Sequence, residues 1–188
     1  MNLLTDTLLD FLIIDGKKYK IKTDFKIWIK VSQIMSGTSF NAENMIKIIG
    51  MVFEDIPSNL WETIQEILRF LNPLAKKGGQ NKNEKITRRI FDYELDSEYI
   101  YSAFWQQYNI NLCCADLHWW QFLALFNCLS EDTAFSKIIQ YRNIDLKEIK
   151  DKEMRKFYRK MKNLYALSDD RTQDEKEADF NERIAELF

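Results

Sequence analysis

The sequence predicts a mainly α-helical protein, a compact multi-helix domain with a small β-hairpin near its N-terminus. Hydrophobic residues make up 46% of the 188 residues and charged residues 30%, so the chain can bury a sizeable core. Only five glycines and two prolines are present, which argues against a fold of many short strands and turns. Along several segments, apolar residues recur at the three- and four-residue intervals of a helix face.

The predicted hairpin covers about residues 11–22. The runs "FLII" and "KYKIK" flank Asp15-Gly16, a pair that tolerates the positive φ angles of a tight hairpin turn. Alternation places Tyr19 and Ile21 on one face. The opposite face carries a row of lysines, namely Lys18, Lys20 and Lys22. We interpret this row as a solvated edge that discourages strand addition, in preference to a nucleic-acid patch.

Three helices are expected before residue 74. Thr23 or Asp24 can cap the first helix and Asn41 the second. Pro57 lies near the start of the third helix, which Asn72-Pro73 ends. The residues predicted to face the core follow helical spacing; they are Phe25, Trp28, Val31, Met45, Ile48, Ile49, Val52, Phe53, Leu60, Ile64, Ile67, Leu68 and Leu71.

A polar stretch, "AKKGGQNKNEK", predicts a mobile basic loop over about residues 75–88. A solvated loop is the default interpretation, and a docking site for an acidic partner is the alternative. The following "RRIFDYEL" is expected to form a short extended piece before Asp96 or Ser97 caps a helix. We interpret the acids of this region as solubility and capping groups; they are Asp92, Glu94, Asp96 and Glu98.

The stretch "DLHWWQFLALFNCL" (residues 116–129) holds the only histidine. Nearly all of it is apolar, which predicts a central buried helix on which His118 stacks over Phe122. No serine, cysteine or acid is placed to act with the imidazole, so a core histidine is favoured over a catalytic one. Trp119 and Trp120 point in different directions, one into the core and the other to an inter-helix seam or a partner surface. The cysteines Cys113, Cys114 and Cys128 are expected to be buried free thiols in a reducing cytosol.

A further helix is expected from Asp132, and the charge then changes sharply. Residues 147–162 carry eight basic and three acidic side chains, whereas residues 169–188 carry three basic and eight acidic ones. Both segments are amphipathic; their apolar residues are Met154, Phe157, Tyr158 and Met161 in the first, and Phe180, Ile184 and Leu187 in the second. They are either two solvated helices that attract each other or a tail that docks on a partner. We expect one domain over residues 1–168 and an acidic helical tail over 169–188.

Several function classes find no support in the sequence. It contains no glycine-rich phosphate loop, GxSxG, HExxH or EF-hand pattern, so we expect no enzyme, no catalytic residue, no cofactor and no metal site. No N-terminal signal peptide is expected, because Asp6 and Asp10 interrupt the apolar run there. No membrane span is expected either, because polar residues punctuate the apolar region 99–130. The net charge of −2 gives no global attraction to nucleic acid.

Five segments, taken in order, resemble a family of tail-module proteins from long-tailed bacteriophages and prophages of Gram-positive hosts. They are "IDGKKYKIKTDFKIW" (14–28), "FEDIP" (53–57), "FDYELDSEYIYSAFWQQYNINL" (91–112), "LHWWQFLALFNCL" (117–129) and "IIQYRNIDLKEIKD" (138–151). The resemblance implies a tail assembly chaperone of the host cytoplasm that binds the tape-measure protein, the tail tube protein or a companion chaperone. It implies no active site. Cys128 departs from the pattern, since a glycine is expected there.

The residues expected to contact a partner are Trp105, Trp119, Trp120, Lys76, Lys77, Phe157 and Tyr158. Self-association into a homo-oligomer is a further expectation. Two alternatives to the chaperone stay open at this point. One is a structural tail component retained in the virion. The other, less favoured, is a nucleic-acid-binding protein that uses residues 76–89 and 147–162.

Overall fold

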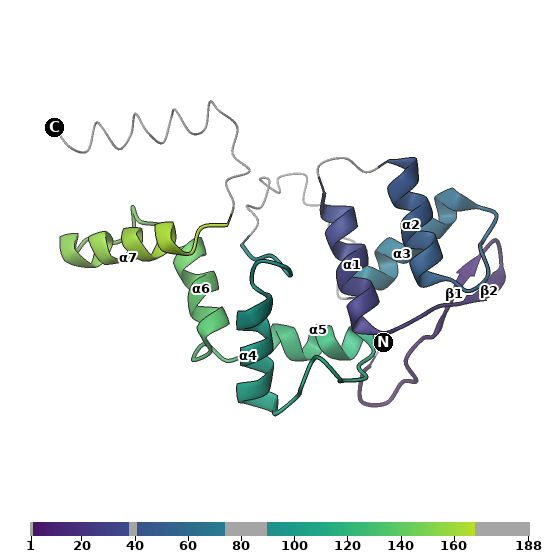
Figure 1. The fold of residues 1–188 in the computed structure, drawn as a ribbon, viewed down its shortest axis with the longest axis horizontal. Coiled ribbons are helices and arrows are strands. Elements are labelled where there is room, and N and C mark those ends of the chain that lie inside the picture. Colours follow the sequence, from purple (N-terminus) through teal and green to yellow (C-terminus); the bar gives the residue numbers. More distant parts are fainter. Residues whose placement is uncertain (1, 38–40, 74–89, 168–188) are drawn as a thin grey trace.

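A computed structural model describes residues 2–37, 41–73 and 90–167 of the chain (Figure 1). These residues form seven α-helices and one two-stranded antiparallel hairpin, so the predicted mainly α class is confirmed. The elements are β1 (Phe11–Ile14), β2 (Lys17–Lys20), α1 (Phe25–Ser36), α2 (Ala42–Val52), α3 (Leu60–Leu71), α4 (Ser97–Tyr108), α5 (Trp119–Asn127), α6 (Ala134–Asn143) and α7 (Lys152–Leu164). The predicted basic loop and acidic tail lie outside the described residues.

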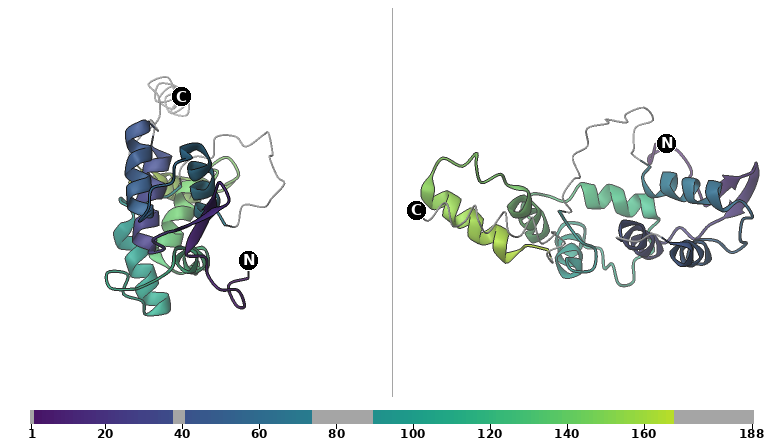
Figure 2. Two further views of the ribbon diagram at one scale, coloured as in Figure 1. Left: turned by 90° about the vertical axis from the view of Figure 1, so that its right-hand side faces the viewer. Right: turned by 90° about the horizontal axis from the view of Figure 1, so that it is seen from above.

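The molecule is elongated. Figure 1 places the hairpin with α1, α2 and α3 at one end, α4 and α5 in the middle, and α6 and α7 at the other end. The view from above shows the same order, with α7 extending away from the hairpin (Figure 2). No helix in the described ranges combines the length and apolar character that a bilayer crossing requires.

The hairpin has the predicted turn. Phe11 pairs with Lys20 and Ile14 with Lys17, while Asp15 and Gly16 take φ angles of 49° and 74°. Two positive φ angles in a two-residue turn match the right-handed twist of the strands. The turn is tied to the start of α3, because the Asp15 amide donates to Glu62 Oε2 at 2.8 Å. The inner face is buried and the lysine row is exposed, as predicted.

Short polar side chains begin most of the helices. Asp24 accepts from the Lys26 amide at the start of α1, and Asn41 accepts from the Asn44 amide at the start of α2. Both caps were predicted, since each satisfies a backbone amide that a helix leaves unpaired at its first turn. α3 begins after Asn59, which accepts from the Glu62 amide. α6 begins at Ala134 after its N-cap Thr133, two residues later than the predicted start at Asp132.

The core is built largely from stacked aromatic rings. Phe122 of α5 lies at its centre, with its ring centroid 4.9 Å from that of Phe25 and 5.2 Å from that of Phe104. It therefore joins α5 to both α1 and α4. Trp28 packs on Phe70 at 4.3 Å and connects α1 to α3 in the same way. Such offset and tilted aromatic pairs are favourable beyond the area that they bury.

The predicted inner face of the third helix is wrong in part. Leu60 and Leu68 are exposed, whereas Thr63 and Phe70 are buried together with Ile67. The helix is turned so that Phe70 meets Trp28, and this places the two leucines toward solvent. Burial of Thr63 is compatible with its hydroxyl, which donates to the Asn59 carbonyl at 2.7 Å.

The predicted position of His118 inside a helix is also wrong. α5 begins at Trp119, and His118 is its N-cap. The residues before it are held extended by a two-bond bridge to the start of α1: the Phe25 amide donates to the Leu117 carbonyl at 3.1 Å, and the Trp119 amide donates to the Thr23 carbonyl at 2.8 Å. This bridge prevents the helix from continuing toward Cys114, so His118 does not stack over Phe122 as a helix would place it.

Three further expectations are corrected. The cysteines Cys113, Cys114 and Cys128 are free but exposed, because they lie in turns and at a helix end and not on a buried helix face. Cys128 ends α5 with a φ angle of −102°, a conformation open to any residue, so no glycine is needed there. The described part of the predicted extended piece, residues 90–95, leads into a turn in which Asp92 Oδ1 accepts from the amides of Glu94 and Leu95.

Candidate partner-binding surface

The outer edge of α7 is an apolar feature of the described surface that the core does not use. None of the thirteen residues of α7 is buried. Met154, Phe157 and Leu164 are 52%, 49% and 64% exposed, and Met161 lies between them. These four residues, called here the α7 seam, follow a 3-4-3 spacing. That is the spacing of the contact positions of a coiled coil, so the seam has the form of a surface for a second helix.

The side of α7 next to the seam is fixed to the rest of the protein. The ring of Tyr141, on α6, lies 6.2 Å from that of Tyr158 and 5.9 Å from that of Tyr165. Arg155 Nε donates to the Ile149 carbonyl at 2.9 Å. Tyr141 also touches one seam residue, Phe157, whose ring lies 6.4 Å from its own. These contacts hold the helix in one orientation and leave Met154 and Leu164 of the seam exposed.

A positive charge surrounds the seam. Residues 147–162 carry a net charge of +5, and five of their lysines are exposed, namely Lys147, Lys150, Lys152, Lys156 and Lys160. Apolar side chains flanked by lysines favour an amphipathic partner helix with acidic flanks, because charge complementarity increases both the rate and the specificity of docking.

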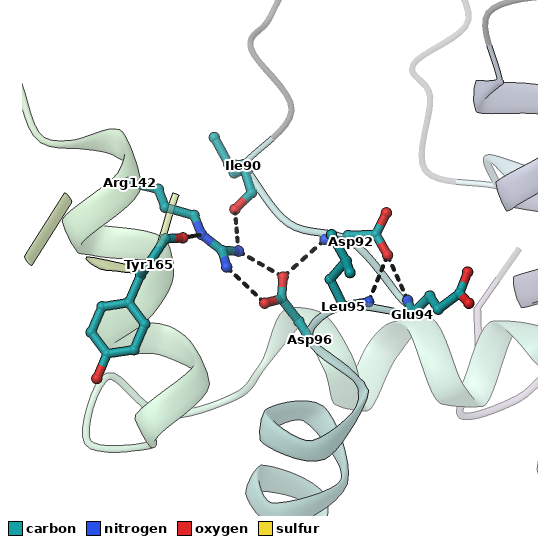
Figure 3. Close-up of polar contacts among 7 residues, drawn as sticks. All are labelled: Ile90, Asp92, Glu94, Leu95, Asp96, Arg142 and Tyr165. Carbon is teal, nitrogen blue, oxygen red and sulfur yellow. Dashed lines mark hydrogen bonds and ion pairs between the residues drawn. The ribbon is translucent and has the colours of Figure 1, made fainter. Parts of the chain in front are cut away.

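A buried ion pair positions α7 relative to α4 (Figure 3). Arg142 of α6 holds the Asp96 carboxylate with two bonds, Nη1 to Oδ2 at 2.6 Å and Nη2 to Oδ1 at 2.7 Å. Its Nε donates to the Tyr165 carbonyl at 2.5 Å, just beyond α7, and Nη1 also donates to the Ile90 carbonyl at 3.1 Å. The arginine therefore joins the start of α4, the end of α7 and the segment at residue 90.

The acids around this ion pair have two separate roles. Asp92 stabilises the turn, as the capping interpretation predicted, and its own amide donates to Asp96 Oδ2 at 2.9 Å. Asp96 makes no side-chain cap bond to α4, because both of its oxygens are directed to Arg142. The sequence interpretation missed this pair, since its two members lie 46 residues apart.

Among the predicted partner-binding residues that the structure describes, Phe157 and Tyr158 have their rings in contact. The rings of Phe157 and Tyr158 lie 5.4 Å apart on α7. Trp105 is exposed on a different helix, α4, where it stacks on Tyr101. Lys76 and Lys77 lie outside the described residues.

Trp119 and Trp120 are both buried against α3, which fits the expected alternative that one ring fills the core and the other an inter-helix seam. Both are buried, and their indole N–H groups donate to neighbouring backbone carbonyls of α3, Trp119 to Leu71 at 3.1 Å and Trp120 to Phe70 at 2.8 Å. These bonds satisfy the polar end of each ring inside the core. The pair therefore fastens α5 to α3 and leaves the seam as the better candidate surface.

A hollow lies between α1 and α4. Its volume is about 620 Å³, and Ile29, Ile100, Tyr93 and Phe122 are among its lining residues. Burial raises the pKa of Tyr93 to about 12, so its phenol remains protonated at neutral pH. The hollow therefore offers apolar contacts with a neutral hydroxyl, which suits an apolar side chain.

The single histidine is fully engaged in structure. Its Nδ1 accepts from the Trp120 amide at 3.1 Å, which leaves Nε2 to donate to the Leu9 carbonyl at 3.0 Å. Burial lowers the pKa of His118 and outweighs the Leu9 carbonyl and the charge of Asp10, both of which favour the protonated ring. Among the described residues, no group of three or more histidine, cysteine or acidic side chains is arranged to hold a metal ion.

Comparison with known proteins decides the family. The family model described as "Bacteriophage Gp15 protein" matches residues 4–167. The chain belongs to this family. As a member of the Gp15 family it is a bacteriophage protein, and the matched region includes the hairpin, the ion pair and all of α7. No curated protein and no solved structure matches the chain.

Proposed function

We propose that this Gp15-family protein is a tail morphogenesis factor of phages of Gram-positive hosts. It acts in the host cytoplasm as a tail assembly chaperone that binds the tape-measure protein and tail tube subunits. Its role is to bind protein, without chemistry of its own. The observation that carries the proposal is the α7 seam: a heptad-spaced apolar edge that is largely exposed, on a helix held in place by aromatic contacts with α6 beside the seam.

The chemistry of the seam suits a helical client. A tape-measure protein is expected to be long, helical and hydrophobic, and it needs cover before the tail tube encloses it. An amphipathic helix recognises another helix through apolar anchors at three- and four-residue intervals. Two of the four seam residues, Met154 and Met161, are methionines, whose flexible side chains adapt to varied apolar surfaces.

The test is co-expression with the tape-measure protein of the same gene cluster, followed by affinity capture and mass measurement. Met154→Glu places a charge in the seam at the third residue of α7, where the helix N-terminus favours an acid. The matched control is Asn163→Glu, which makes the same charge change at an exposed position on the opposite side of α7. We expect a soluble complex with wild type and with the control, and at least tenfold less complex with Met154→Glu.

Either of two results would contradict this proposal. The tape measure could stay insoluble beside wild type, or both variants could capture it equally well. Recovery of the protein from purified virions at a fixed copy number would support a structural tail component instead.

The exposed lysines around α7 also favour nucleic acid as a second candidate ligand. That reading requires binding that falls steeply with salt concentration.

A further inference from the structure

We propose that the acidic segment 169–188 of this same chain docks on the α7 seam and covers it until a client displaces it. The docking concerns the protein alone. Only the regulatory consequence, competition with a client, rests on the proposed function.

Charge selects this occupant over a second copy of α7. Two seams pressed together would bring two segments of net charge +5 into contact, which like-charge repulsion opposes. Segment 169–188 carries eight acidic and three basic side chains, a net charge of −5. It complements the exposed lysines around the seam in sign and in size.

The apolar pattern of the segment matches the seam as well. Phe180, Ile184 and Leu187 follow a 4-3 spacing, the spacing of one edge of a helix in a coiled coil. The seam offers Met154, Phe157, Met161 and Leu164 at the corresponding 3-4-3 spacing. Contact between these two edges would remove both from water, and the acids would remain at the rim beside the lysines.

The chain connection makes the contact intramolecular. Arg142 holds the Tyr165 carbonyl, so the acidic segment departs from a fixed point at the end of α7. Fourteen residues separate Tyr165 from Phe180 and can span up to about 45 Å. α7 is about 20 Å long at 1.5 Å per residue, so the segment can reach any part of the seam. A short tether of this kind gives a high effective concentration of the segment at the seam.

Hydrogen exchange of the full-length protein tests the docking in the absence of any client. The variant Phe180→Gln, Ile184→Gln, Leu187→Gln removes the apolar edge of the segment without a change in charge. The matched control, Ala178→Gln, Asn181→Gln, Ala185→Gln, places three glutamines away from that edge. We expect the amides of α7 to exchange at least tenfold faster in the first variant than in wild type and the control. We also expect 1 M salt to reduce the difference.

Equal exchange of α7 in all three proteins would overturn the proposal. Protection that disappears on dilution, together with a dimer mass, would overturn it too, because the covering segment would then come from a second copy. In the co-expression assay, the first variant should capture more tape measure than wild type at the same concentration. Failure of that assay alone counts against the proposed function and leaves the exchange result standing.

Discussion

At the residue scale, His118 links a helix start to the protonation state of one ring. Nδ1 caps α5 only while it carries no proton, and Nε2 must keep its proton to reach the Leu9 carbonyl. The neutral ring thus meets both requirements, whereas the charged ring loses the cap. The residue that would first suggest acid–base chemistry in this sequence is therefore used to begin a helix.

This arrangement predicts a pH dependence of stability. The pKa of His118 is lowered in the folded state, so just below the ordinary histidine value of about 6.5 the unfolded chain binds more protons. The free energy of unfolding should therefore fall as the pH falls from about 6.5 to the lowered pKa. The stability that neutral His118 contributes is fully present above about pH 6.5. Urea unfolding at pH 7.5 and 5.5 measures this change.

His118→Asn is the matched variant, because asparagine can cap the helix without titrating. We expect it to lose less stability than wild type between pH 7.5 and 5.5. His118→Ala should cost about 1 kcal/mol at pH 7.5 through loss of the cap. An equal pH response in wild type and His118→Asn would show that other groups are responsible.

At the element scale, the core depends on a single ring shared by three helices. Phe122→Ala should destabilise the protein by about 3–5 kcal/mol, since it leaves a cavity between α1, α4 and α5. Phe122→Leu should cost less because it keeps most of the apolar volume. Thermal unfolding compares both with Asn127→Ala, an exposed change on the same helix that should stay within about 0.5 kcal/mol. Equal losses for Phe122→Ala and Asn127→Ala would contradict the central role of the ring.

The same scale shows what the sequence can predict. The Asp15-Gly16 turn and the Asp24 and Asn41 caps depend on residues within a few positions of one another, and all three predictions were confirmed. The start of α5 was wrong because it depends on a bridge to residues 23–25, almost a hundred positions away. Apolar periodicity located α3 but gave part of the wrong face, since partners elsewhere in the chain decide which apolar residues are covered.

The candidate site could likewise be predicted where it depends on neighbouring residues, and not where it depends on distant ones. An amphipathic pattern at 154–161 could be predicted, and it correctly placed Phe157 and Tyr158 together on one helix. Whether that edge stays exposed depends on α6, whose Tyr141 contacts both Tyr158 and Phe157 and leaves Phe157 half exposed. For Trp119 and Trp120 the sequence left an inter-helix seam and a partner surface both open, for the matching reason. An aromatic side chain serves a core or a partner equally well, and only the fold supplies the carbonyls that bury these two.

At the scale of the whole molecule, Arg142 connects the distal α6–α7 end to the body. Its guanidinium bonds to Asp96, Ile90 and Tyr165 at once, so this side chain helps to set the orientation of the α7 seam together with the Tyr141 contacts. Arg142→Met would leave the Asp96 carboxylate buried without its counter-charge. Loss of one partner of a buried pair typically costs about 3–5 kcal/mol, and we expect a loss of that size in urea unfolding.

The double variant Asp96→Leu, Arg142→Met separates the cost of the unpaired charge from the loss of the connection. It should recover much of the stability lost in Arg142→Met, because no charge is then left buried. The Tyr165 carbonyl would still lack its bond to Arg142, so hydrogen exchange in α7 should stay faster than in wild type while exchange in α1 and α5 returns to normal. If stability and α7 exchange recovered together, the ion pair would serve stability alone, and the seam would be positioned by the aromatic contacts of Tyr141.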